Sequence, residues 1–154
     1  IGSRDGLFYI NEATGVVKSF VKPVLTSDLI LTISFYQGEY YIGTYGGGMM
    51  VLNPETLSLK YFAQGDTELF QKGHIFCVKP DAKGNLWIGT SQGLFSYNGQ
   101  TKQIKSFTSA NSQLPEGNVY EVSFDSTGKG WIATETGMCI YDPASQSLSF
   151  PKDS

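Results

Sequence analysis

The stretch NLWIGTSQGLFSYN, residues 85–98, decides the fold of this chain. Its apolar residues stand two apart on both sides of a break that contains Gly93, which predicts two short strands joined by a turn. Similar stretches occur at residues 39–53 (EYYIGTYGGGMMVLN) and 128–142 (GKGWIATETGMCIYD). The chain also opens on IGSRDGLFYIN, residues 1–11, which matches the same phrase without its beginning. The sequence is therefore a set of repeats.

The copies follow one another at intervals of 41, 46 and 44 residues, measured between the isoleucines at Ile1, Ile42, Ile88 and Ile132. A glycine opens the second strand of each pair, at Gly6, Gly48, Gly93 and Gly137. A polar turn residue ends that strand, at Asn11, Asn53, Asn98 and Asp142. An aromatic residue closes each copy, at Phe20, Phe62, Phe107 and Phe150. Differences in repeat length of this size are typical of loops.

Each repeat contains four strand-sized runs, because a further apolar run precedes the isoleucine at residues 29–35, 75–80 and 119–124. The connections are too short for helical crossovers, so neighbouring strands must pair antiparallel as a meander. A period of about 40 to 50 residues with four strands is typical of propeller blades. We therefore predict an all-β fold, a fragment of a β-propeller with about three and a half four-stranded antiparallel blades.

We expect residues 1–154 to form one partial propeller, with an incomplete blade at about residues 1–20 and further blades at about 29–62, 75–107 and 119–150. The sequence has no initiator Met and starts inside a blade, which indicates a piece of a longer protein. Trp87, Trp131 and Tyr41 share one position of the repeat and are predicted to fill the space between sheets. DAKGN (81–85) and DSTGK (125–129) are predicted hairpin turns, whereas YQGEY (36–40) lacks the Asp.

Composition argues against several functions. Glycine is frequent (18 residues) and charged residues make up only 16%, as expected of buried strands and many turns. A net charge of −3 without a Lys/Arg cluster argues against nucleic acid and against direct membrane contact. No apolar run approaches the roughly 20 residues of a membrane span. Cys77 and Cys139 fall at different places in the repeat, and we expect both to stay reduced.

Residues 81–101, DAKGNLWIGTSQGLFSYNGQT, resemble the repeat of the two-component regulator propeller family: an Asp turn, Gly-Asn, Trp-Ile-Gly-Thr, Gly-Leu and a polar turn. Residues 111–142 are similar, including the Leu-Pro before the first strand, and residues 39–53 match more weakly, with Tyr41 in place of Trp. The resemblance implies seven-bladed propellers in the extracytoplasmic, periplasmic part of hybrid sensor histidine kinases, many of them linked to sensing of polysaccharide breakdown products.

The sequence gives little support to catalysis or to metal and cofactor binding. His74 is the only histidine, so a multi-histidine metal site cannot be built. GTYGGG (43–48) lacks the Lys-Ser/Thr and the helix that follow a phosphate loop, and DAKGN lacks the alternating carboxylates of a calcium loop. We therefore expect no catalytic residue, no metal site and no cofactor site in this chain.

Ligands of propellers bind on the faces where loops meet, and sugars bind well against aromatic rings flanked by amides and carboxylates. Tyr45, Phe70 and Tyr120 are the candidate ligand-binding residues on this criterion. The resulting hypothesis is a non-catalytic sensory segment that detects oligosaccharides, with the kinase elsewhere in the parent chain. The alternatives are a propeller enzyme, either a lyase or a hydrolase, and a scaffold for protein partners.

Two further expectations follow. No segment keeps a 3.6-residue period over 10 residues, so no helix should exceed about two turns, and only residues 63–74 and 108–118 could hold one. An end blade without a neighbour exposes an apolar sheet face. We expect this face to pack against the rest of the parent propeller, or to cause self-association of the isolated chain.

Overall fold

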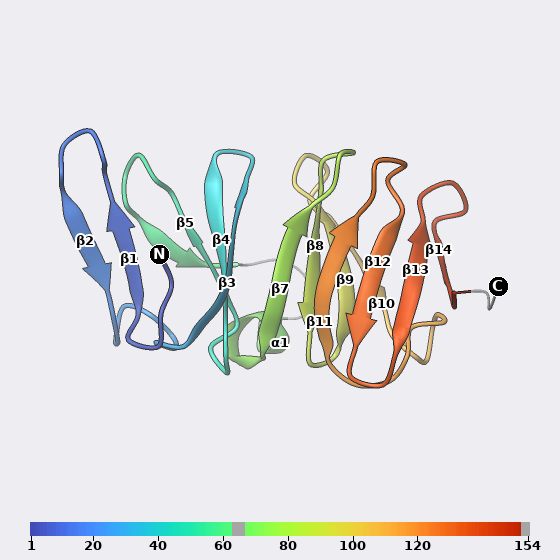
Figure 1. The fold of residues 1–154 in the computed structure, drawn as a ribbon. Helices are drawn as coiled ribbons and strands as arrows, with labels where there is room; N and C mark the ends of the chain where they lie inside the picture. The colour runs from blue at the N-terminus through green and yellow to red at the C-terminus, as the bar shows by residue number, and fades with distance from the viewer. Residues whose placement is uncertain (63–66, 152–154) are drawn as a thin grey trace. The chain divides into compact units, whose positions relative to one another are not determined.

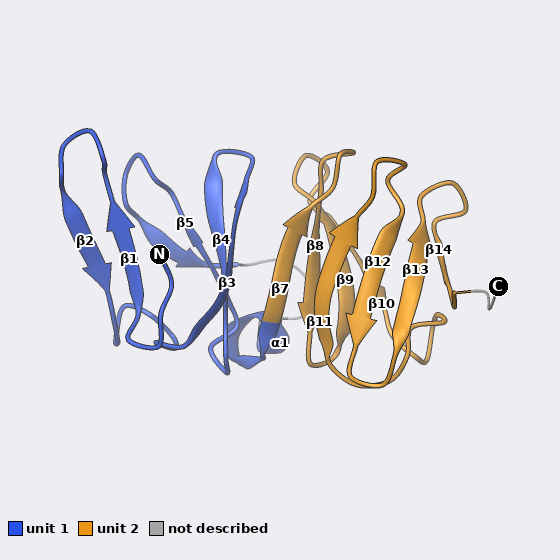
Figure 2. Cartoon of the chain, viewed as in Figure 1, with its two compact units in different colours: residues 1–75 blue, residues 76–154 orange. Residues whose placement is uncertain are grey.

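The computed structural model describes residues 1–62 and 67–151, which form fourteen β-strands and one short helix. All strands pair antiparallel, in three four-stranded sheets and one two-stranded sheet (Figure 1). The predicted all-β fold with four-stranded antiparallel blades is thereby confirmed. The chain divides into two compact units, residues 1–75 and 76–154 (Figure 2). That the sheets belong to one propeller stays a prediction.

Unit 1 contains the incomplete blade and the first complete one. The two-stranded sheet consists of β1 (Leu7–Ile10) and β2 (Val17–Phe20). The four-stranded sheet runs in chain order through β3 (Ile30–Tyr36), β4 (Glu39–Thr44), β5 (Met49–Leu52) and β6 (Leu59–Tyr61). In such a meander, the hairpin between the second and third strands lies at the same end as the connection from one blade to the next. We call this end the loop end of a blade.

The hairpin between β3 and β4 forms although the sequence lacks the usual Asp there. Gln37 and Gly38 both have positive φ, 49° and 84°. Two central residues with positive φ give a turn whose twist matches that of the paired strands. Gly38 therefore takes over the role that the Asp turn has in the other blades.

Unit 2 contains the other two complete blades, although the first residue of β7, Ile75, falls in unit 1. The third sheet consists of β7 (Ile75–Pro80), β8 (Asn85–Thr90), β9 (Gly93–Asn98) and β10 (Gln103–Phe107). The fourth consists of β11 (Val119–Phe124), β12 (Gly130–Thr134), β13 (Met138–Asp142) and β14 (Ser147–Ser149).

The turns are held by the polar residues that recur in the sequence. At the end opposite the loop end, the side-chain oxygen of the turn residue accepts backbone N–H bonds two and three residues on, at Asn11, Asn53 and Asn98. At the loop end, a threonine hydroxyl donates to the carbonyl of the glycine that closes the hairpin, in Thr44–Gly48, Thr90–Gly93 and Thr134–Gly137. The repeated residues thus satisfy backbone groups that the strand ladders leave open.

Asp81 links the turn of the third sheet to its core. One carboxylate oxygen accepts the backbone N–H of Lys83 and of Asn85, and the other accepts the indole N–H of Trp87 at 2.9 Å. Asp125 occupies the same position in the fourth sheet, and its bond to the indole of Trp131 is longer, 3.4 Å. The Asp six residues before the Trp therefore fixes both the turn and the orientation of the indole.

Trp87 is the centre of the core of unit 2. It is 1% exposed, its ring centroid lies 4.5 Å from that of Tyr141, and it stacks on Phe107 at 5.7 Å. Tyr41, at the same repeat position in unit 1, is also buried (6% exposed). Trp131 is 41% exposed, so the expectation that it fills a space between sheets is wrong for the described residues. Among the described residues of unit 2, no second sheet packs on the face of the fourth sheet that carries Trp131.

The single helix, α1 (Thr67–Lys72), has six residues and precedes β7. It begins with Glu68 in its first turn and ends with Lys72 in its last, an order of charges that suits the helix dipole. Among the described residues this confirms the expected limit of two turns and one of the two expected locations. Residues 63–66 of that loop lie outside the described residues.

Cys77 and Cys139 are free thiols buried in the same core cluster of unit 2. Burial, with the nearby Glu121 carboxylate, raises the pKa of Cys77 to about 12, and burial raises the pKa of Cys139 to about 11. Since the thiolate is the reactive form, we expect neither thiol to react with iodoacetamide at pH 8 in the folded chain. Both should react once the chain is unfolded in guanidinium, as counted by mass spectrometry. Rapid labelling of either cysteine in the folded chain would contradict the packing of this core.

Candidate ligand-binding surface

Tyr45 is presented by the glycine-rich hairpin between β4 and β5, at the loop end of its blade. Thr26 donates its hydroxyl hydrogen to the carbonyl of Gly47 (2.6 Å), and Ser27 donates to the carbonyl of Tyr45 (2.9 Å). These bonds hold the hairpin while the Tyr45 side chain stays 51% exposed. Its ring stacks on the imidazole of His74 with a centroid distance of 4.0 Å. Tyr45 is therefore an exposed ring on a fixed support.

Gly48 allows this hairpin to approach helix α1. It has a φ of 71°, and a Cβ built on it would lie 2.0 Å from the carbonyl oxygen of Phe70. Its N–H donates to the carbonyl of Gly73 at 2.9 Å. The glycine run thus forms a tight hairpin between two strands, as its sequence context indicates.

Phe70 is not an exposed aromatic residue. It is 0% exposed, and its ring lies edge-on to Phe62 with a centroid distance of 5.0 Å. The reason is the short helix, which presents Leu69 and Phe70 to the core of unit 1. The expectation that Phe70 contacts a ligand is corrected accordingly, because its side chain has no surface to offer.

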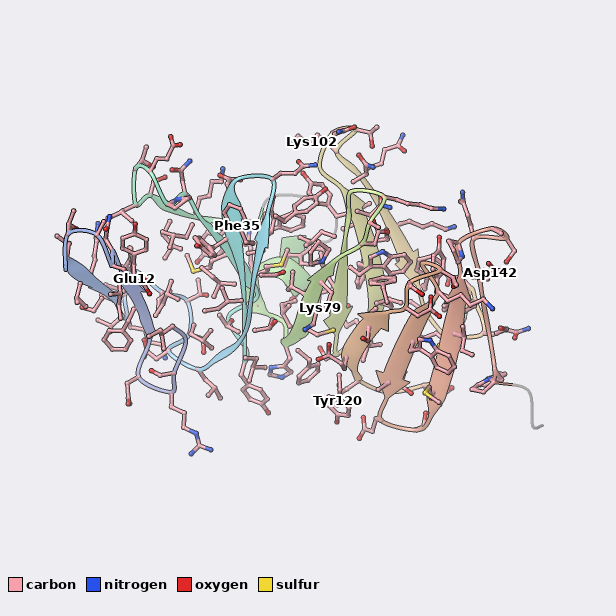
Figure 3. All side chains as sticks on the ribbon, turned by 45° about the horizontal axis from the view of Figure 1, so that its top comes forward. Glu12, Phe35, Lys79, Lys102, Tyr120 and Asp142 are labelled. Atoms are coloured by element: carbon pink, nitrogen blue, oxygen red, sulfur yellow. The ribbon has the colours of Figure 1, made fainter. Side chains whose placement is uncertain are left out.

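Tyr120 lies near the start of β11, at the loop end of the fourth sheet. Figure 3 shows it at the opposite end of unit 2 from Lys102, which lies in the turn between β9 and β10. Tyr120 is 44% exposed, and its ring lies edge-on to Phe76 at 5.1 Å. Its hydroxyl oxygen accepts the side-chain N–H of Asn118 at 3.2 Å. The ring is thus anchored at its edge and at its hydroxyl while one part stays open to solvent.

A carboxylate joins this group. Glu135, in the hairpin between β12 and β13, accepts the backbone N–H of Asn118 at 3.2 Å. The backbone N–H of Glu135 donates to the carbonyl of Asn118 at 2.9 Å. We call Tyr120, Asn118 and Glu135 the Tyr120 cluster. It combines an aromatic ring, an amide and a carboxylate, which are the groups that hold a sugar ring and its hydroxyls.

A small pocket of about 160 Å³ adjoins the Tyr120 cluster through Glu116 and Gly117, which directly precede Asn118. Gln92 and Thr108 also line it. The pocket thus extends the polar surface of the cluster along the loop end of unit 2. Tyr45 belongs to unit 1 and the Tyr120 cluster to unit 2, so each is a candidate surface of its own unit.

A pocket of about 480 Å³ lies between the third and fourth sheets, away from the loop end. Its polar lining includes the amides of Asn85, Asn98 and Gln103 and the side chains of Lys83 and Lys105. The ammonium group of Lys105 lies 4.9 Å from the centroid of Phe107. The rings of Trp87 and Phe107 beneath it are buried, 1% and 4% exposed, so they offer little surface for stacking. This pocket was not predicted from the sequence, because its lining residues lie in different turns and strands and form no motif together.

No arrangement typical of a metal centre is found in the part of the chain that the structure describes, where no three His, Cys, Asp or Glu side chains gather. Helix α1 is the one helix within residues 1–62 and 67–151, and none there has the length and hydropathy of a membrane span.

Solved structures share this fold over the whole chain. The extracellular domain of a hybrid two component system from B. thetaiotaomicron is 28% identical, with a TM-score of 0.72, over 99% of this chain and 19% of its own length. The extracellular domain of a second such system from that organism is 20% identical with a TM-score of 0.78, over 99% of this chain and 20% of its own length. The second likeness shows the fold alone. The chain thus spans about a fifth of these proteins.

A comparison with curated protein sequences gives no match. The family model described as "Two component regulator propeller" matches residues 70–92, which comprise part of α1, strand β7 and the Trp-Ile-Gly-Thr stretch of β8. The expected resemblance is confirmed: the chain carries a two component regulator propeller repeat within blades similar to those of extracellular domains of hybrid two-component systems.

Proposed function

We propose that this chain is a non-catalytic, ligand-binding segment of the extracellular sensor region of a hybrid two-component histidine kinase. The observation that carries the proposal is the 28% identity over 99% of the chain to such an extracellular domain. In this proposal the segment lies in the periplasm, as part of an inner-membrane protein, and phosphotransfer takes place in another domain of the parent chain. The ligands are oligosaccharides.

The loop ends of the blades support the choice of ligand. Tyr45 and Tyr120 each present a half-exposed ring. The Tyr45 ring stacks on His74, and the Tyr120 ring packs edge-on against Phe76. The apolar face of a sugar ring packs well on such a surface, and a ring that is already ordered loses little conformational entropy on binding. The amide and carboxylate of the Tyr120 cluster could then bind the hydroxyl groups at the edge of the sugar.

We expect Tyr120→Ala to weaken oligosaccharide binding roughly tenfold, which corresponds to about 1.4 kcal/mol. The control is Tyr61→Ala, because Tyr61 is equally exposed (46%) but lies on the outer strand β6. Binding would be measured by isothermal titration calorimetry with short neutral and uronate-containing oligosaccharides. An equal loss in both variants, or no loss in Tyr120→Ala, would exclude the Tyr120 cluster as the site.

The same oligosaccharides distinguish a sensor from an enzyme. Mass spectrometry of each oligosaccharide after incubation shows whether it is cleaved. A sensor segment returns the sugar intact, whereas a propeller lyase or hydrolase shortens it. Shortened products would favour the enzyme alternative over the proposal.

The outer face of the fourth sheet is the proposed contact with the rest of the propeller. Trp131 and Met138 on this face are 41% and 45% exposed, and their strand partners Ile140 and Ala133 lie on the same face. In the isolated chain we expect a second copy to cover this face, so that light scattering on a size-exclusion column gives a dimer or larger assembly. Trp131→Glu should shift the assembly toward monomer. A monodisperse monomer that melts above about 65 °C would contradict this expectation.

A further inference from the structure

The pocket of about 480 Å³ in unit 2, which we call the turn-end pocket, is lined by turns of both sheets. Lys83 comes from the turn between β7 and β8, Thr101 from the turn between β9 and β10, and Gln146 from the turn between β13 and β14. Its volume lies within the range of about 300–1,000 Å³ that is typical of small-molecule sites. It shares no lining residue with the Tyr120 cluster or with the small pocket beside that cluster.

Two amide side chains that line the turn-end pocket have their oxygens occupied. Asn98 donates a side-chain N–H to Oδ1 of Asn85 at 3.0 Å, and Asn85 donates in turn to Oδ2 of Asp81 at 2.9 Å. Oδ1 of Asn98 accepts the backbone N–H groups of Gln100 and Thr101. Each of the two amide nitrogens carries a second hydrogen. These amides therefore offer a ligand mainly hydrogen-bond donors.

The charged residues that line the turn-end pocket, within the part of the chain that the structure describes, are Lys83 and Lys105. The chain as a whole has a net charge of −3, so this lining differs from it in sign. The ammonium group of Lys83 lies 3.4 Å from the carbonyl oxygen of Pro143, and that of Lys105 lies over the ring of Phe107. Each ammonium group carries three hydrogens, so both can also donate to a ligand. The pocket therefore favours an anion.

Two carboxylates adjoin this pocket without lining it. Burial, and after it the charges of Asp81 and Asp142, raise the pKa of Tyr141, whose side chain lines the pocket. Asp81 is already engaged by its own turn and by an indole N–H, and Asp142 accepts the backbone N–H of Ala144. Hydrogen bonds of this kind stabilise the charged form of a carboxylate. The two lysines are therefore not needed as partners for these carboxylates.

A second pocket of about 440 Å³ continues from the first along the outer strands β10 and β14. The two pockets share Lys105, Phe107 and Gln146. Asn111 and Ser112 add an amide and a hydroxyl group to the second pocket, and within the described residues its lining contains no Asp or Glu. A ligand whose anionic group is held by Lys105 therefore meets further hydrogen-bonding groups beside it.

We infer that the turn-end pocket binds a small carboxylate that also carries hydroxyl groups, such as a sugar acid. The carboxylate is held by the ammonium groups of Lys83 and Lys105, because hydrogen bonds between charged partners are the strong ones. The hydroxyl groups accept from the amide nitrogens of Asn85 and Asn98. A neutral sugar gains nothing from the lysines, and the buried rings beneath offer it little surface for stacking. This site is separate from the proposed oligosaccharide site at the loop end and does not depend on it.

Nuclear magnetic resonance of the indole N–H groups tests this inference. The chain has two tryptophans, so isotope-labelled protein gives two indole signals, which the variant Trp131→Phe assigns. Trp87 lines the pocket and Trp131 does not. We expect glucuronate to shift the Trp87 signal saturably, with a dissociation constant of about 1 mM, as is reasonable for exposed ion pairs. The Trp131 signal should stay in place, and glucose should give no saturable shift.

Lysine variants test the residues that hold the carboxylate. We expect Lys83→Gln and Lys105→Gln each to weaken glucuronate binding roughly fivefold. The matched control is Lys102→Gln, because Lys102 lies in the turn between β9 and β10 but does not line the pocket (Figure 3). Glutamine fits there, since Gln146 holds the same turn position with a similar φ, 53° against 60°. The control variant should bind glucuronate as the unaltered chain does.

Four results would overturn the inference. Equal affinity for glucose would show a site for neutral sugars. Equal affinity for N-acetylaspartate amide, which has a carboxylate but no hydroxyl group, would indicate an acidic peptide as the partner. An equal loss in Lys102→Gln and Lys105→Gln would show a general effect of charge. Loss of glucuronate binding in Tyr120→Ala would place the ligand at the loop end, whereas loss of oligosaccharide binding alone in that variant would support two separate sites.

Discussion

Trp87→Ala is expected to lower the free energy of unfolding by about 3–5 kcal/mol, the usual cost of truncating a buried Trp or Phe. Trp87 is 1% exposed, contacts Phe107 and Tyr141, and donates its indole N–H to Asp81. The variant therefore loses apolar contacts, creates a cavity and leaves one carboxylate oxygen of Asp81 with fewer donors. Denaturation in urea, followed by circular dichroism, measures the change.

Trp131→Ala is the matched control, since Trp131 has the same repeat position and the same kind of Asp partner. It is 41% exposed, so its removal should cost about 1 kcal/mol or less at protein concentrations where the chain is monomeric. Equal losses in the two variants would show that the environments of the two tryptophans do not differ as described.

Gly48→Ala is expected to destabilise the chain by roughly 2–4 kcal/mol, because two costs add. The residue has a φ of 71°, which is unfavourable for alanine, and the added Cβ would lie 2.0 Å from the carbonyl oxygen of Phe70. Helix α1 would have to move away from the hairpin, and the bond between Gly48 and Gly73 would lengthen or break. Urea denaturation again gives the loss.

Gly38→Ala separates the two costs. Its φ is 84°, and no atom lies within 4 Å of the position of an added Cβ. It should therefore show only the cost of a positive φ for alanine, about 1–2 kcal/mol. If Gly48→Ala were no worse than Gly38→Ala, the close approach between the hairpin and α1 would be wrong.

The fold could be predicted because the same residue types recur at the same strand and turn positions in each repeat. The period, the Asn and Asp turns and the strand-sized runs together leave few alternatives to four-stranded antiparallel blades. The exposure of Trp131 could not be predicted from the repeat. The repeat predicts where a residue lies within its own sheet, but not whether another sheet packs on its side chain. Burial of Trp87 depends on Tyr141, which lies 54 residues further along the chain.

The candidate site was predicted only in part. Tyr45 and Tyr120 are exposed at the loop ends, in line with their place next to hairpins and connections. Phe70 could not be assigned from its loop position, because a six-residue helix formed there and turned its ring inward. Glu135 was missed as a partner of Asn118, since the two are brought together by the pairing register of β11 and β12, in which Val119 lies opposite Thr134, rather than by a motif.

The most direct test of the central claim is a phosphorylation assay on the full-length protein in membrane vesicles. Radiolabelled ATP is supplied on the kinase side, and the oligosaccharides that bind the isolated chain are supplied on the other. The account predicts autophosphorylation that changes with oligosaccharide concentration and loses this response in Tyr120→Ala but not in Tyr61→Ala. A full-length protein without kinase activity, or one that cleaves the oligosaccharide, would contradict it.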